Sequence, residues 1–382
     1  MSELGVFGTE GALASDVAEK IAAVDSSVYT KSLRGSSGEI FYLRKIKRGR
    51  ELVILSKSGE EPGAGFSGKV TDIKAGGAEF KAKICDTGHS NAVAMREKFS
   101  FARPVPLGLK TSFGMGDRIG IATPGHIRAA EKYDFAPILP QQSIREMART
   151  GRTPDMVMDD ACWGVFQEGY ERPFGADADH LKTEDDVRYT YKAGFTFYTI
   201  DPSDFLNFGA DIMSDSEVDS AFEKLFTDVK HKESFLLRYS GKFELADFDS
   251  SKSVTFEFTP EMLKRIAVKY LSAVRHTIKM YRLLTELFGD TDRFDFEMSV
   301  DETPTPTTPM EHLFVAVEMK RAGVVLQSLA PRYPGEFQKG IDYIGDVDIF
   351  RNGFERHALI ARNFGPYKLS IHSGSDKFSV FP

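Results

Sequence analysis

The sequence predicts an α/β fold: a TIM-type (β/α)8 barrel preceded by a small, mainly β domain. Seven apolar runs of about five to seven residues follow residue 113, and each ends in polar residues and leads into a helical stretch. Near-continuous apolar runs separated by helices are typical of a parallel sheet covered on both faces. Seven in series favour a barrel over an open sheet. The residues before them alternate short segments rich in β-branched and aromatic residues with glycine-containing turns, which indicates a mainly β domain.

We therefore predict two domains. Residues 1–108 form the mainly β domain, with a helix over residues 12–24 and strands within 39–43, 52–55 and 68–73. Residues 109–382 form the barrel domain, which carries the residues suited to chemistry. Its seven predicted strands are residues 118–123, 135–139, 175–183, 195–200, 294–300, 324–329 and 367–371.

Two features refine the barrel. Residues 204–258 form a long insertion between the fourth and fifth runs. A helix follows it, with Thr259 as N-cap, Pro260 in the first turn and Gly289 at the end. The sequence stops just after the seventh run, so we expect a barrel cut after strand seven.

Composition and charge exclude several classes of protein. The net charge of −7 shows no excess of Lys and Arg for binding a phosphate backbone, so no nucleic-acid partner is expected. Cys85 and Cys162 are far apart, which argues against a disulfide framework or a thiolate zinc site. No run of 18 apolar residues occurs, so no membrane span is expected. We expect a cytoplasmic protein, and leave open whether it forms a homo-oligomer.

Polar residues at the ends of the predicted strands give an inventory of the site, because barrel active sites form at the C-terminal ends of strands. The inventory comprises His126, Gln141, Gln142, Asp177, Asp179, His180, Lys182, Asp201, Glu297, Asp301, Glu302, Arg332, His372, Ser373, Ser375, Asp376 and Lys377.

A divalent cation is the best explanation for this inventory. His180 and His372 each follow a predicted strand, and two imidazoles with a carboxylate suit a cation that polarises a ketone. A lone strand-end histidine is more often structural, but several carboxylates crowd the same strands, and burying them together is costly without a cation or a shared proton. One difficulty is that regular alternation places Asp179 and His180 on opposite faces of a strand. Both reach one site only if the strand bends or ends there.

Specific motifs then resemble those of the tagaturonate epimerase family over about residues 110–382. They are the segments 112–118, 122–126, 141–143, 149–153, 159–169, 175–180, 199–203, 299–303 and 372–379. The first hundred residues match only loosely.

The resemblance implies interconversion of D-tagaturonate and D-fructuronate with a divalent metal such as Zn, Mn, Ni or Fe. By motif, Asp179 is similar to the family's proton acceptor and Glu297 to its proton donor, with His180 and His372 as two metal ligands. The third ligand stays open among residues of two loops, although an acidic residue is expected where Gln338 stands. These candidates are Glu336, Gln338, Asp342 and Glu302.

The expected partner is a small hexuronate, whose carboxylate needs a cation such as Arg332, which can bind it bidentately, or Lys377. Gln141 and Lys182 are further expected substrate contacts. The two sugars differ at C4, where the C–H is not acidic, so a retro-aldol route is expected. Two alternatives remain: another metal-dependent sugar isomerase or aldolase, and a non-catalytic sugar-acid binding protein.

Overall fold

The computed structural model describes residues 10–13, 18, 19, 21, 23, 25–57, 60–75, 78–247 and 253–381. The chain divides into two compact units, residues 1–178 with 189–196 and residues 179–188 with 197–382. Strand β9 (Gly175–Leu181) runs from the first unit into the second. No helix in the described part of the chain is long and apolar enough to cross a membrane. The predicted division at residue 108 stays a prediction.

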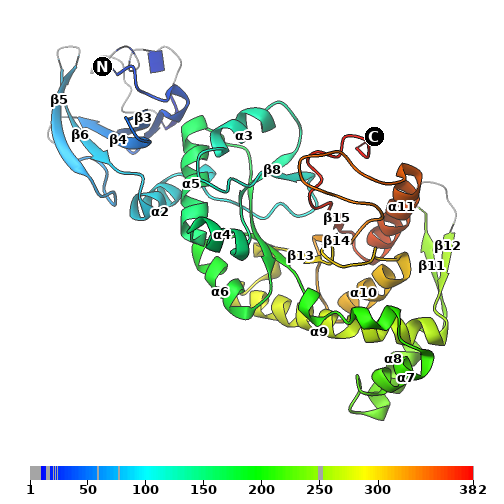
Figure 1. Cartoon of the computed structure of the whole chain (residues 1–382). Coiled ribbons are helices and arrows are strands. Elements are labelled where there is room, and N and C mark those ends of the chain that lie inside the picture. Colours follow the sequence, from blue (N-terminus) through cyan, green and yellow to red (C-terminus); the bar gives the residue numbers. More distant parts are fainter. Residues whose placement is uncertain are drawn as a thin grey trace. The chain divides into compact units, whose positions relative to one another are not determined.

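The first unit contains an antiparallel sheet, which confirms the expected mainly β N-terminal region (Figure 1). Its strand order is β1-β2-β3-β4-β6-β5. The bounds are β1 Gly11–Ala12, β2 Arg34–Ser36, β3 Glu39–Lys45, β4 Arg50–Lys57, β5 Lys69–Ala75 and β6 Ala78–Cys85. Alternating residues of β3 and β4, among them Ile40, Tyr42 and Val53, point into one apolar cluster. The helix predicted over residues 12–24 falls largely outside the described residues.

A second sheet contains seven strands in the order β15-β14-β13-β10-β9-β8-β7. Pairs β7–β8, β8–β9, β10–β13, β13–β14 and β14–β15 are parallel. Beyond β9, the bounds are β7 Ser112–Gly114, β8 Ala136–Gln141, β10 Phe197–Ile200, β13 Asp295–Ser299, β14 Ser328–Ala330 and β15 Lys368–Leu369. Six of the seven predicted runs contain or overlap one of these strands. Strands β7 and β15 are the two edges, so the sheet is open in the described residues, as in a half-barrel. The closed barrel stays a prediction.

The prediction for the first strand was wrong. Residues 118–122 form a turn that leads into a helix at residue 123, and the strand is β7, which lies earlier in the chain. The buried carboxylate of Asp117 causes the turn, because it accepts hydrogen bonds from the backbone N–H groups of residues 119, 120, 122 and 123. Gly120 has a φ of 80°, which closes the turn. Ile119 and Ile121, which gave the segment its strand-like pattern, are 68% and 73% exposed.

Helix α2 His89–Lys98 follows the antiparallel sheet. The helices that connect the parallel strands along the chain are α3 Thr123–Ala130, α4 Ile144–Thr150, α5 Pro154–Glu168, α6 Glu184–Ala193, α9 Pro260–Phe288, α10 Pro309–Arg321 and α11 Val347–Phe364. Helix α9 confirms the predicted helix, since the Thr259 side chain accepts from the Met262 N–H and Gly289 ends the helix with a φ of 73°. Helix α10 begins with a capping box between Thr308 and Glu311.

The stretch before α9 contains small elements of its own in the second unit (Figure 1). They are the 3-10 turns η5 Ser203–Phe205 and η6 Phe208–Asp211, helices α7 Asp215–Glu223 and α8 Val229–Arg238, and the hairpin of β11 Lys242–Ala246 and β12 Ser253–Glu257. Further 3-10 turns are η3 Thr30–Ser32, η4 Ser100–Ala102 and η7 Thr291–Arg293. Helix α8 packs against α10 through aromatic rings: Phe235 contacts Phe314, and Tyr239, the C-cap of α8, stacks on Phe314 at 5.5 Å between centroids. This contact joins the insertion to the helices that follow the parallel strands.

Candidate metal centre

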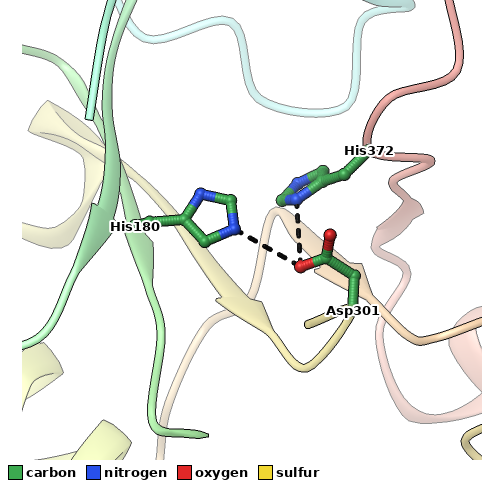
Figure 2. Close-up of side chains that lie close together, drawn as sticks. All are labelled: His180, Asp301 and His372. Carbon is green, nitrogen blue, oxygen red and sulfur yellow. Dashed lines mark hydrogen bonds and ion pairs between the residues drawn. The ribbon is translucent and has the colours of Figure 1, made fainter. Parts of the chain in front are cut away.

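Two histidines and one aspartate of the second unit meet at the carboxyl-terminal ends of β9, β13 and β15 (Figure 2). Asp301 lies two residues after β13, and its Oδ1 is 3.4 Å from His180 Nε2 and 3.2 Å from His372 Nδ1. The two imidazole rings are 5.1 Å apart between centroids. One ligand atom from each residue lies within 4.8 Å of the other two. Three donors at this spacing can share one ion.

The backbone at His180 resolves the difficulty of strand alternation. His180 has a φ of 55°, a left-handed conformation that only a few per cent of non-glycine residues adopt. The change of direction lets Asp179 and His180 reach the same place, and Asp179 Oδ1 lies 2.7 Å from His180 Nδ1. Unusual backbone conformations of this kind cluster at functional sites. Ser373, beside His372, has a φ of 52°.

Each of the three triad residues also has a hydrogen-bond partner outside the triad. His180 Nδ1–H donates to Asp179, His372 Nε2–H donates to Glu297 Oε1 at 2.9 Å, and the Ser299 hydroxyl donates to Asp301 Oδ1. Histidines that bind metals generally donate their other ring N–H to a carboxylate or carbonyl, which fixes the tautomer. Both histidines here have that arrangement.

The carboxylates raise the affinity of the two imidazoles for a proton. Burial lowers the pKa of His180, but hydrogen bonds to Asp179 and Asp301 outweigh it and raise the pKa to about 11. Burial also opposes the charge on His372, but Glu297 and Asp301 raise its pKa well above the usual value. For Asp301, burial raises the pKa, whereas the neighbouring His180 and His372 lower it far more. A site that attracts protons so strongly also attracts cations, and the two compete for the same nitrogen atoms.

The donor set fits a divalent cation. His372 Nδ1 is buried and makes no hydrogen bond to a described residue, although Asp301 Oδ1 lies 3.2 Å away. His180 Nε2 lies 3.4 Å from the same oxygen. Two imidazole nitrogens therefore face one carboxylate oxygen, an arrangement whose charge either protons or a divalent cation can neutralise. Two imidazole nitrogens and one carboxylate oxygen leave coordination positions for substrate oxygens.

Other predicted site residues already have protein partners. Gln141 donates to Asp177 at 2.9 Å within the first unit. In the second unit, Lys182 Nζ lies 2.8 Å from Asp204 Oδ1 and also contacts Asp201.

The two predicted carboxylate-binding cations differ in their surroundings. Lys377 is fully buried, and its Nζ donates to the carbonyls of Gln338 and Ile341, both at 2.8 Å. Arg332 is partly exposed, and one Nη donates to the carbonyl of Thr303, two residues beyond Asp301. Lys377 therefore holds the loop from Gln338 to Ile341, whereas Arg332 lies beside the segment that carries the triad.

The candidates for a third ligand lie outside the triad. Glu336 and Gln338 are exposed and bond to each other, with Gln338 Nε2 at 2.6 Å from Glu336 Oε2. Asp342 accepts from the Ser379 hydroxyl, and Glu302 is exposed. The structure instead brings Asp301 to the two histidines. Asp301 belongs to the strand-end inventory, but nothing in the sequence ranks it above its neighbour Glu302.

Sequence reasoning missed the supporting hydroxyls Ser299, Ser328 and Thr199. For Ser299 the available signal is its spacing of two residues from Glu297, which places both on one face of β13. The partners on neighbouring strands depend on register, which the sequence does not reveal.

Comparison with known proteins identifies the family of the chain. The profile of the tagaturonate epimerase family matches residues 29–382. The chain belongs to the tagaturonate epimerase family. The match begins well before residue 110, so it includes much of the N-terminal sheet that the motifs resembled only loosely. Members of this family are epimerases, so the chain is an enzyme of the isomerase class.

Relatives are similar over most of the chain. The tagaturonate/fructuronate epimerase of Thermotoga maritima is 43% identical over 356 residues, which cover 93% of this chain and 70% of the relative. Crystal structures of the fructuronate-tagaturonate epimerase of Cohnella laeviribosi are also similar. The native structure has a TM-score of 0.83 at 38% identity, and a complex with one glycerol has 0.84 at 37%. Both cover 96% of this chain and 71% of theirs.

Proposed function

We propose that the chain interconverts D-tagaturonate and D-fructuronate with a divalent cation held by His180, Asp301 and His372. The observation that carries the proposal is the triad, in which each residue bonds to a polar group outside the triad. Within the described residues, His372 Nδ1 is buried and makes no hydrogen bond. Membership of the tagaturonate epimerase family supports the choice of substrate. A bound divalent cation supplies Lewis acidity, which stabilises negative charge on the oxygens of a sugar.

The stereochemistry favours a retro-aldol route. In the ketose, C4 is β to the C2 ketone, so removal of its hydrogen as a proton gives no stabilised anion. In the proposed route a base takes the C4 hydroxyl proton, the C4–O bond becomes an aldehyde, and the C3–C4 electron pair moves toward the ketone. The aldehyde half turns over, C3 adds to its other face, and the proton returns to the C4 oxygen. No oxidant or reductant is needed.

Asp179 is the proposed base. Its side chain is 17% exposed and lies against His180, so a hydroxyl held at the triad would be within reach. Glu297 is the proposed partner acid, on β13 and in contact with His372. Pairs of carboxylates take opposite roles when their surroundings differ, and Glu297 is buried whereas Asp179 is partly exposed.

Arg332 is the proposed partner of the substrate carboxylate. A guanidinium binds a carboxylate with two parallel N–H groups, and Arg332 uses one Nη on the Thr303 carbonyl. Lys377 is the weaker candidate because its ammonium group is buried against two carbonyls. We further propose that the seven parallel strands form the wall of a (β/α)8-type barrel, with the triad at the C-terminal ends of the strands.

The test is an assay of the purified chain with D-tagaturonate, followed by NMR for the appearance of D-fructuronate. We expect turnover that a chelator abolishes and an added divalent cation restores. Full turnover at a metal content far below one ion per chain would overturn the metal role. The retro-aldol step predicts that a three-carbon aldehyde can be trapped, and exchange of the C4 hydrogen with solvent would contradict it. Net release of three-carbon products would instead indicate an aldolase.

A further inference from the structure

A row of buried polar side chains crosses three neighbouring strands. Thr199 on β10 stands opposite Glu297 on β13, and Glu297 stands opposite Ser328 on β14. Residues opposite one another in a parallel sheet point to the same face. The three side chains are 0%, 1% and 2% exposed, so all of them are buried from solvent. Asp301 lies in the turn after β13, and His372 contacts both Glu297 and Asp301, so the row lies next to the triad.

The row fixes both oxygens of the Glu297 carboxylate. The Ser328 hydroxyl donates to Oε2, and the Thr199 hydroxyl donates to Oε1 at 3.3 Å. His372 Nε2–H donates to the same Oε1 at 2.9 Å. A buried carboxylate held by hydroxyls on both sides cannot rotate without leaving a donor unpaired, which costs about 1–3 kcal/mol.

His372 needs such support because no strand carries it. It follows β15 by three residues, in a turn where Ser373 has a left-handed backbone. Within the described residues, the hydrogen bond from Nε2 to Glu297 is the one that orients its ring. The orientation of Glu297 therefore determines the direction of Nδ1.

We propose that Ser328 and Thr199 are positioning residues that act through Glu297. They hold the carboxylate so that the His372 ring keeps its proton on Nε2 and directs Nδ1 toward Asp301. The inference rests on the proposed function in one respect, because His372 Nδ1 must point toward Asp301 in order to bind a divalent cation with it. Ser328 has the larger effect, since its hydroxyl bonds to Oε2, whereas Oε1, the oxygen bonded to Thr199, also accepts from His372.

The test compares Ser328→Ala, Thr199→Val and the double variant with Thr277→Val. Thr277 is equally buried, but its hydroxyl bonds to the Ala273 carbonyl of α9, outside the row. Calorimetric titration of metal-free protein with Co²⁺ gives the affinity, and the visible spectrum of the Co²⁺ complex reports its coordination. Loss of a supporting partner weakens metal binding about 10- to 100-fold in known sites. We expect Ser328→Ala to weaken Co²⁺ binding about tenfold and shift the spectrum, Ser328→Thr to restore both, and Thr277→Val to change neither.

A readout without metal separates this inference from the proposed function. In metal-free protein, the proton NMR signal of His372 Nε2–H should be downfield and slow to exchange, and Ser328→Ala should broaden or remove it. If wild-type protein bound no Co²⁺, the metal role would fall. If Ser328→Ala kept both the wild-type Nε2–H signal and the wild-type Co²⁺ affinity, the positioning role would be overturned.

Discussion

Asp179 and His180 are consecutive residues whose side chains meet, with 2.7 Å between Oδ1 and Nδ1. The left-handed backbone of His180 makes the contact, because a regular strand would send the two side chains to opposite faces. The pair joins a candidate base to a candidate metal ligand, and the two roles can be separated by substitution.

The first prediction concerns Asp179. In Asp179→Asn, the amide oxygen can still accept from His180 Nδ1–H, but it cannot take a proton from a sugar hydroxyl. We expect kcat to fall by about 10² or more, in the range for a lost general base, while Zn²⁺ affinity changes by less than about tenfold. Asp179→Ala should lower both kcat and the affinity for Zn²⁺. Steady-state kinetics and calorimetric titration with Zn²⁺ measure the two effects, and a wild-type kcat in Asp179→Asn would exclude the base.

The second prediction concerns two buried histidines away from the triad. His312 Nδ1 lies 2.8 Å from His357 Nδ1, and His312 Nε2 lies 2.8 Å from the Tyr367 hydroxyl. His357 also bonds to the backbone of Thr307, so it donates there and accepts from His312. The Tyr367 hydroxyl then donates to His312. In this series of hydrogen bonds both imidazoles are neutral, and a proton added to either ring would have no hydrogen-bond acceptor.

Burial lowers the pKa of His357 to about 4 and that of His312 well below its usual value. A lowered pKa in the folded state means that the unfolded state binds protons first as the pH falls. The contribution of the two neutral histidines to the free energy of unfolding is complete above about pH 6.5. The part due to His357 alone should fall by about 3 kcal/mol between pH 6.5 and 4. Urea unfolding across this range should show a smaller loss in His357→Gln than in His231→Gln, a control at an exposed histidine. Equal pH profiles for the two variants would refute the prediction.

The third prediction concerns Lys269, a lysine of α9 whose side chain is 4% exposed. Burial lowers its pKa, but hydrogen bonds to Asp211 and Glu311 raise it above the usual value. Nζ lies 2.7 Å from Glu311 Oε1, within the capping box of α10. Lys269→Met leaves Glu311 buried without its cation, so the free energy of unfolding should fall by about 3–5 kcal/mol.

Lys264 on the same helix provides the matched control. It pairs with Asp219, whose side chain is 57% exposed, so Lys264→Met should cost less than about 1 kcal/mol. Urea unfolding of both variants gives the comparison. Similar losses in the two would show that burial does not set the strength of the Lys269 network.

Local patterns predicted much of the fold. Helix α9 is bounded by Thr259 and Gly289, and both signals lie within the sequence of the helix itself. The prediction of a strand at residues 118–123 was wrong because it relied on the number of apolar residues. The turn found there is instead formed by the carboxylate of Asp117, which accepts hydrogen bonds from backbone N–H groups.

The triad was harder to predict than the fold. His180 and His372 stand out because imidazoles at strand ends are rare, and the structure brings them together. Asp301 does not stand out, because its place between them depends on the register of β13, β14 and β15. The left-handed conformation of His180 has no signal in the sequence either. Contacts between loops that follow different strands are set by the assembled sheet, so periodicity along the chain cannot reveal them.

The most direct measurement is a crystal structure of the chain soaked with Mn²⁺, with data collected for the anomalous signal of manganese. The account predicts one strong anomalous peak within bonding distance of His180 Nε2, His372 Nδ1 and a carboxylate oxygen of Asp301. An active, metal-loaded protein whose anomalous peak lies elsewhere, with the triad empty, would contradict it.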